Sequence, residues 1–192
     1  MSKSSLGLLL LACAFLLAAC GIDLAGTPPF DDLTFSNGYG DIAAPDGRTW
    51  KVTFEFSKDS IFTGVVRHTS RWYDSSVPFM SHDILVVTGD FASQEFVDVS
   101  VFDHKFFYHY EDRDNPPQGN INLLHIFPAS QEVFEQLKQI QDWNNVSIRG
   151  REILKIDLFD AEGKSKGFYM DMGCNTILVT SVTVNAEGAP VP

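Results

Sequence analysis

The side chains of this sequence best suited to chemistry are its histidines, because a neutral imidazole binds transition metals and titrates near neutral pH. The five histidines are His68, His82, His104, His109 and His125. His104 and His109 are an odd number of residues apart, so on one strand their side chains would face opposite ways. The chain has no HExxH motif and no cysteine–histidine spacing typical of zinc sites. We therefore predict no metal site and no cofactor.

Covalent catalysis would need a nucleophile beside a base, and the sequence offers one weak candidate. There is no G-x-S-x-G motif, and Ser81-His82-Asp83 are consecutive, so their side chains cannot converge as a triad. Cys174 would form a thiolate–imidazolium pair only if folding brought it to His125, and Asp171 is an alternative partner. We expect Cys174 to be buried and structural instead, because it precedes a strand-like segment. A non-enzymatic protein is therefore favoured, with a small hydrolase or thiol enzyme using Cys174 as the alternative.

A third candidate site is aromatic. Trp72, Tyr73, Phe79 and Met80 lie close together in an irregular segment that contains Pro78. Such side chains could line a pocket or form a contact patch, and we predict binding here. The alternative is that they close one end of the domain as a small satellite core, with Phe79 pointing inward.

The N-terminus has the pattern of an export signal. Lys3 precedes an apolar run, Leu6–Ala19, which is shorter than the ~20 residues that span a bilayer. Leu17-Ala18-Ala19-Cys20 resembles the lipobox of bacterial lipoproteins, in which the cysteine is acylated and becomes the first residue of the mature chain. This resemblance implies a signal peptide at 1–19 and lipidation at Cys20. Gly21 follows where inner-membrane retention usually has aspartate, so the resemblance implies the outer membrane, facing the periplasm.

The charge balance limits the partners. Fourteen basic and twenty-five acidic residues give a net charge of −11, and removal of Lys3 with the signal makes it about −12. An acidic surface repels phosphate backbones and anionic lipid headgroups. We therefore expect no nucleic-acid partner, and membrane attachment through the acyl chains alone.

The remaining sequence predicts a tether at 20–32 and one β-rich domain at 33–186. Thr49–Ser57 alternates apolar and polar residues with a period of two, as expected of a strand with one buried face. Ser130–Gln141 instead carries apolar residues at helical spacing. Further strands are predicted at Ile61–Arg67, Ile84–Thr88, Val97–Phe102, Lys105–Tyr110, Ile121–Phe127, Val146–Asp160 with a bend at Gly150, Gly167–Met172 and Thr176–Val184. This predicts a mostly β (α+β) fold, either a small antiparallel OB-like barrel or a sandwich, with one helix packed on it at about 130–141.

Several short motifs resemble a group of uncharacterised bacterial exported or membrane-associated proteins. They are Trp72 with Pro78-Phe79-Met80-Ser81, Phe107-Tyr108-His109-Tyr110, His125-Ile126-Phe127-Pro128-Ala129, Val146-x-Ile148-x-Gly150 and Gly173-Cys174. Those proteins carry serine, arginine and aspartate before the glycine–cysteine pair, where this chain has Tyr169-Met170-Asp171-Met172. The resemblance implies the domain boundaries and no activity.

Together these features predict a lipid-anchored protein of the cell envelope. Its β-rich domain is expected to bind a protein or envelope component without catalysis. Besides the thiol enzyme, the alternative is a binder of a small apolar ligand that uses Trp72, Phe79 and Met80.

Overall fold

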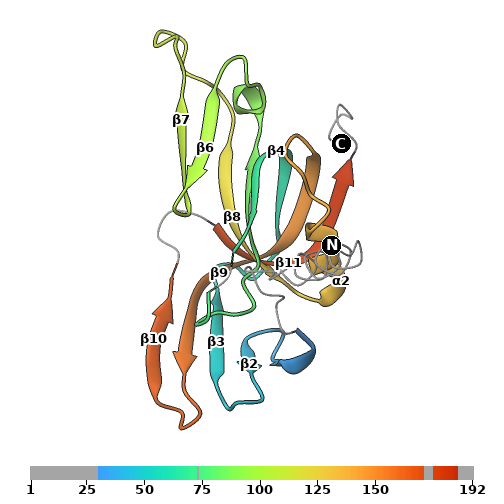
Figure 1. Cartoon of the computed structure of the whole chain (residues 1–192), viewed down its shortest axis with the longest axis vertical. Helices are drawn as coiled ribbons and strands as arrows, with labels where there is room; N and C mark the ends of the chain where they lie inside the picture. The colour runs from blue at the N-terminus through green and yellow to red at the C-terminus, as the bar shows by residue number, and fades with distance from the viewer. Residues whose placement is uncertain (1–29, 73, 171–174, 186–192) are drawn as a thin grey trace, which may run out of the picture.

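The computed structural model describes residues 30–72, 74–170 and 175–185, which form a mostly β structure with one α-helix (Figure 1). The predicted fold class is confirmed. The expected signal peptide, the lipidation site Cys20, and Tyr73, Asp171 and Cys174 lie outside the described residues. Within the described ranges, no helix is long and apolar enough to cross a membrane.

Most strands lie where the sequence alternates or runs apolar. The strands are β1 (Thr34–Ser36), β2 (Asp41–Ala43), β3 (Thr49–Phe54), β4 (Ser60–Arg71), β5 (His82–Val87), β6 (Asp98–Phe102), β7 (Lys105–His109), β8 (Ile121–Pro128), β9 (Asn145–Phe159), β10 (Ser165–Tyr169) and β11 (Asn175–Asn185). The helix is α2 (Gln131–Leu137), and short 3-10 turns occur as η1 (Phe30–Asp32) and η2 (Gly89–Ala92). β1 and β2 were not predicted, because three residues are too few to show a period.

The helix is shorter than predicted. It begins after Ser130, whose hydroxyl accepts a hydrogen bond from the Val133 backbone N–H, as an N-cap does. Past Leu137 the chain continues in turns as far as the buried Ile140, with the Ile140 N–H donating to the Leu137 carbonyl. The apolar spacing predicts a helix to residue 141 because it includes Ile140. This residue is buried, but it belongs to the turn after the helix.

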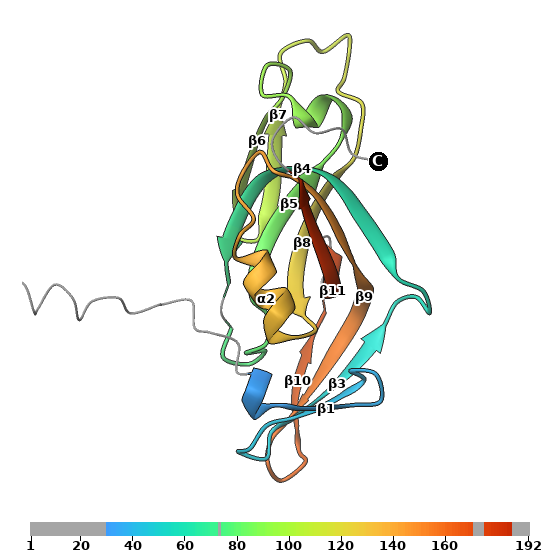
Figure 2. The same cartoon turned by 90° about the vertical axis from the view of Figure 1, so that its right-hand side faces the viewer.

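The long strand β9 joins two parts of the structure. Its first residues pair with β11 on one side and with β4 on the other, and its last residues pair with β3 and β10. The pairings β4–β5–β8–β11–β9–β4 close into a ring, in which β8 and β11 are parallel. Helix α2 follows β8 and packs against it and β11 (Figure 2). Of the two predicted architectures, the closed ring corresponds to the OB-like one.

Gly150 lies where β9 passes from the ring toward the lower sheet of β1, β2, β3 and β10. A Cβ atom at this position would be 2.0 Å from the backbone oxygen of Leu178 on β11. A side chain therefore does not fit there unless the two strands move apart.

Three clusters of buried residues form the core. The first lies between the lower sheet and α2 and includes Trp50, Phe79, Met80, Phe127 and Phe134. The second contains inward-facing ring residues together with Val133 and Leu137 of the helix. The third lies under the β6–β7 hairpin.

The first described residue of the chain packs against the core. Phe30 is buried, and its ring centroid lies 6.1 Å from that of Phe134. The end of the predicted tether, 20–32, therefore contributes a side chain to the first core cluster.

Candidate functional site

A row of polar residues crosses the outer face of the ring. On β5, Ile84 and Val86 face the inner cluster, which leaves Asp83, Leu85 and Val87 on the outer face. Asp83 lies directly opposite His125 of β8 in the strand register. The row continues to Ser70 of β4 beside Asp83 and to Thr176 of β11 beside His125.

The β6–β7 hairpin covers this outer face and supplies a further histidine. Its inner face carries Val99, Val101 and Phe106, which pack on the cluster containing Leu85 and Val87. A two-residue turn, Asp103-His104, joins the strands and points toward the middle of the molecule (Figure 1). Both turn residues have positive φ angles, 50° and 57°, as a type I′ hairpin turn requires. The hairpin thus brings His104 to a row that is built from other strands.

Asp83 is the centre of the resulting cluster. Its Oδ2 atom lies 2.5 Å from Nδ1 of His104, and its Oδ1 atom lies 2.6 Å from Nδ1 of His125. The side chains of Asp83 and His125 are only 3% and 5% exposed, whereas that of His104 is 42% exposed. The cluster therefore extends from a buried carboxylate to a histidine that solvent reaches.

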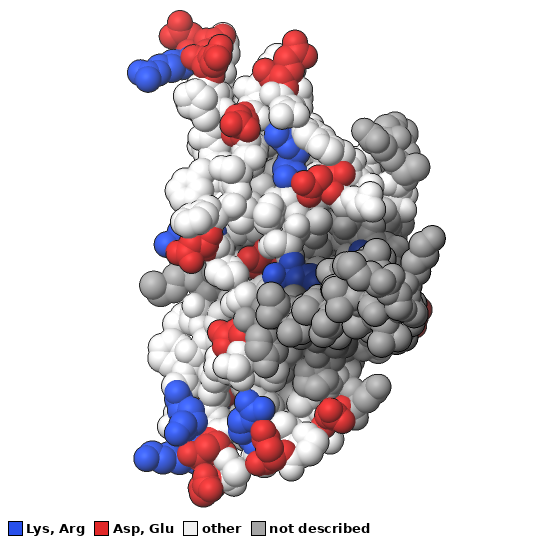
Figure 3. Space-filling model, in the orientation of Figure 1, with Lys and Arg blue, Asp and Glu red and all other residues white. Residues whose placement is uncertain are grey.

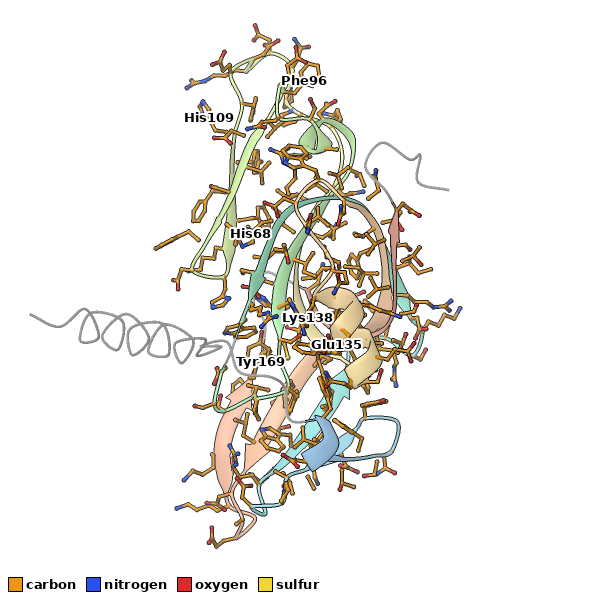
Figure 4. All side chains as sticks on the ribbon, turned by 45° about the vertical axis from the view of Figure 1, so that its right-hand side comes forward. His68, Phe96, His109, Glu135, Lys138 and Tyr169 are labelled. Atoms are coloured by element: carbon orange, nitrogen blue, oxygen red, sulfur yellow. The ribbon has the colours of Figure 1, made fainter. Side chains whose placement is uncertain are left out.

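Trp72 forms one wall of the cluster. Its ring centroid lies 4.6 Å from that of His104 and 5.1 Å from that of His125. The ring centroid of Trp72 also lies 6.0 Å from that of Tyr169, whose hydroxyl lies 3.1 Å from the Thr176 hydroxyl. Figure 4 shows Tyr169 near the middle of the molecule, where β10 ends. Of the two imidazoles, only that of His125 is buried, and burial strengthens its interaction with the carboxylate.

This arrangement has the composition of a metal site. Asp83, His104 and His125 each offer one ligating atom, and these atoms lie within 4.8 Å of one another. Two imidazoles and a carboxylate are a donor set that zinc and other divalent transition metals accept. The three residues belong to three different elements, so the spacing of histidines along a single strand does not join them. The sequence does contain one indication of where His104 lies. Asp103-His104 is a two-residue interval between two strand-like segments, and such an interval predicts a hairpin turn.

His82 is separate from this cluster. It faces the opposite side of β5, where its ring lies 5.6 Å from that of Phe134 and its Nδ1 atom lies 2.9 Å from the Ser81 hydroxyl. Burial, aided by the positive charge of Arg71, lowers the pKa of His82 to about 4. His82 is therefore neutral at neutral pH. As predicted from the sequence, Ser81, His82 and Asp83 do not form a triad.

The predicted aromatic site is only partly brought together. Phe79 and Met80 are fully buried in the first core cluster, so they form no exposed patch. This agrees with the alternative of a core role, in which Phe79 points inward, and gives no support to an exposed contact patch at these two residues. Trp72 is half-buried; it packs against this same core cluster and also contacts the rings of His104 and His125. His125 is paired with Asp83, whereas Cys174, its partner in the thiol-enzyme alternative, is outside the described residues.

The outer face of the hairpin exposes large aromatic side chains. Phe102 and Phe107 are 76% and 53% exposed, and their cross-strand neighbours are Lys105 and Ser100. Charged side chains gather mainly at the two ends of the molecule on the side shown in Figure 3.

No protein-family model and no curated protein matches the chain.

Proposed function

We propose that this protein is a lipid-anchored component of the bacterial cell envelope, at the outer membrane and facing the periplasm, whose β-rich domain binds another protein without catalysis. The observation that carries the binding role is the exposed aromatic face of the β6–β7 hairpin. Its inner face already packs on the ring, so Phe102 and Phe107 are not needed to close the core. Large aromatic side chains left on a protein surface are typical of contact sites.

The hairpin fits a protein partner better than a lipid surface. In the described part of the chain, β6 and β7 pair only with each other, so each leaves one strand edge that a partner strand could join. The net charge of −11 and the acidic residues Glu111, Asp112 and Asp114 after β7 disfavour anionic headgroups. The alternative of a small apolar ligand is disfavoured. Two of the three residues proposed to bind it, Phe79 and Met80, are buried in the core.

The binding role is tested by site-specific photo-crosslinking in cells. A photoreactive phenylalanine analogue at Phe107 should give a discrete adduct with a second protein. The matched control is Phe168 of β10, which is 59% exposed but lies in the lower sheet, and it should not give that adduct. The same adduct at both positions, or none at Phe107, would contradict the proposal.

The anchor is tested by substitution of the lipidated cysteine. Cys20→Ala should abolish attachment to membranes, because the acyl chains supply the affinity at ~0.8 kcal/mol per buried CH₂. Cys13→Ala, within the predicted signal peptide, is the matched control and should remain attached. A membrane-bound Cys20→Ala protein of unchanged intact mass would rule out lipidation at this residue.

A further inference from the structure

We infer that Asp83, His104 and His125 form a mononuclear site for a divalent transition-metal ion of the Zn²⁺ class. This inference is independent of the proposed binding role. It rests on the convergence of two imidazole Nδ1 atoms on the two oxygens of one buried carboxylate, at 2.5 and 2.6 Å.

The three donor atoms are grouped closely enough to converge on one ion, since all of them lie within 4.8 Å of one another. Bonds of about 2.0–2.1 Å in a tetrahedron place the ligating atoms about 3.3 Å apart. The present separations between Asp83 and the two histidines are less than 1 Å shorter than this. His104 can supply the movement, because it lies at the tip of a hairpin and is 42% exposed. A bound ion would replace the hydrogen bonds that now join the two rings to the carboxylate.

The turn itself does not account for a histidine at position 104. Type I′ turns favour asparagine and glycine, which adopt positive φ with little strain. Histidine also occurs at positive φ, and at φ of 57° the imidazole of His104 contacts Asp83 and Trp72. The turn thus places a ligating side chain directly over the buried carboxylate.

The surroundings favour an ion that can exchange. Asp83 is a buried carboxylate, and such groups are found paired or bound to metals. Trp72 shields the imidazoles on one side, while the exposed edge of His104 leaves access from solvent. The described residues supply three of the four ligands that a zinc ion usually takes.

The test uses the mature chain in detergent, treated with chelator and titrated with Co²⁺ as a spectroscopic probe and with Zn²⁺ by calorimetry. We expect one ion per chain and the d–d absorption bands of a four- or five-coordinate Co²⁺ site. His104→Asn should weaken Zn²⁺ binding by at least about 100-fold, because even loss of a group that only supports a ligand costs 10–100-fold. Asparagine tolerates the positive φ angle, so this variant is expected to fold.

The matched control is His109→Asn. His109 is exposed on β7 and opposes Asp98, and Figure 4 shows it at the upper end of the molecule, away from Tyr169. This variant should bind Zn²⁺ as the unaltered chain does. The inference is overturned if the unaltered chain binds neither ion, or if His104→Asn and His109→Asn bind equally well.

Discussion

Acidification should destabilise the fold through the buried imidazole of His82. This side chain begins β5 and packs against the ring of Phe134. Desolvation is the largest cause of its lowered pKa, followed by the positive charge of Arg71, while Asp83 acts in the opposite direction. Protonation of His82 in the folded state therefore places a charge where solvent cannot reach it.

The sign and size of the effect follow from the shift. The pKa of His82 falls from 6.5, its value when the chain is unfolded, to about 4 in the folded protein. The unfolded chain then binds more protons between these values, so the stabilisation is fully present above pH 6.5 and is lost as pH falls toward 4. At 1.36 kcal/mol per pKa unit the total is on the order of 3 kcal/mol, of which about 2 kcal/mol is lost by pH 5.

The measurement is urea unfolding between pH 8 and pH 4.5, in the original protein and in His82→Asn. Asparagine retains a polar group near the Ser81 hydroxyl but does not titrate. Every other ionisable group is present in both proteins, so subtraction of the two pH profiles isolates the contribution of His82. The original protein should lose about 2 kcal/mol more than the variant between pH 8 and pH 5.

Parallel pH profiles for the two proteins would refute the reasoning. They would mean that His82 is protonated equally in the folded and unfolded states. A steeper loss in His82→Asn than in the original protein would have the wrong sign and would refute it as well.

Two substitutions, Phe79→Ala and Gly150→Ala, test the packing, and Gly163→Ala is the control for the second. Phe79→Ala removes a ring that lies 4.6 Å from that of Phe127, and it should lower the free energy of unfolding by about 3–5 kcal/mol, measured by chemical denaturation; a loss below ~1 kcal/mol would place the ring outside the core. Gly150→Ala should cost at least ~2 kcal/mol, because the added Cβ would lie 2.0 Å from the Leu178 oxygen. Gly163→Ala, where no atom lies within 4 Å but φ is +75°, should cost only about 1–2 kcal/mol, and equal melting temperatures for these two variants would contradict the close contact at Gly150.

Much of the fold is predictable because its strands carry their own pattern. β3 alternates buried and exposed residues, and the sequence gives the same alternation at Trp50, Lys51, Val52 and Thr53. The helix start at Ser130 is also local, since one hydroxyl caps the first turn. The orientation of Phe79 and Met80 is less predictable, because an irregular segment has no period from which to read a buried face.

The candidate site could not be assembled from the sequence. Asp83 lies 21 positions before His104 and 42 positions before His125, and no local motif joins the three residues. Asp83 and His125 become neighbours only through the register of β5 on β8, and His104 only because the hairpin lies over that pair. Strand register depends on which faces are buried in the finished fold, so these contacts are a property of the topology.

The position of β11 has a consequence for how the chain folds. This strand lies between β8 and β9, so the ring cannot close until residues 175–185 are in place. Other ring contacts join positions far apart in the chain, such as Ser60 with Gly150. Contacts of such long range make folding slow, on the millisecond-to-second scale. Until β11 docks, β8 and β9 each expose an unpaired edge, and this incompletely folded chain is the species most prone to aggregation.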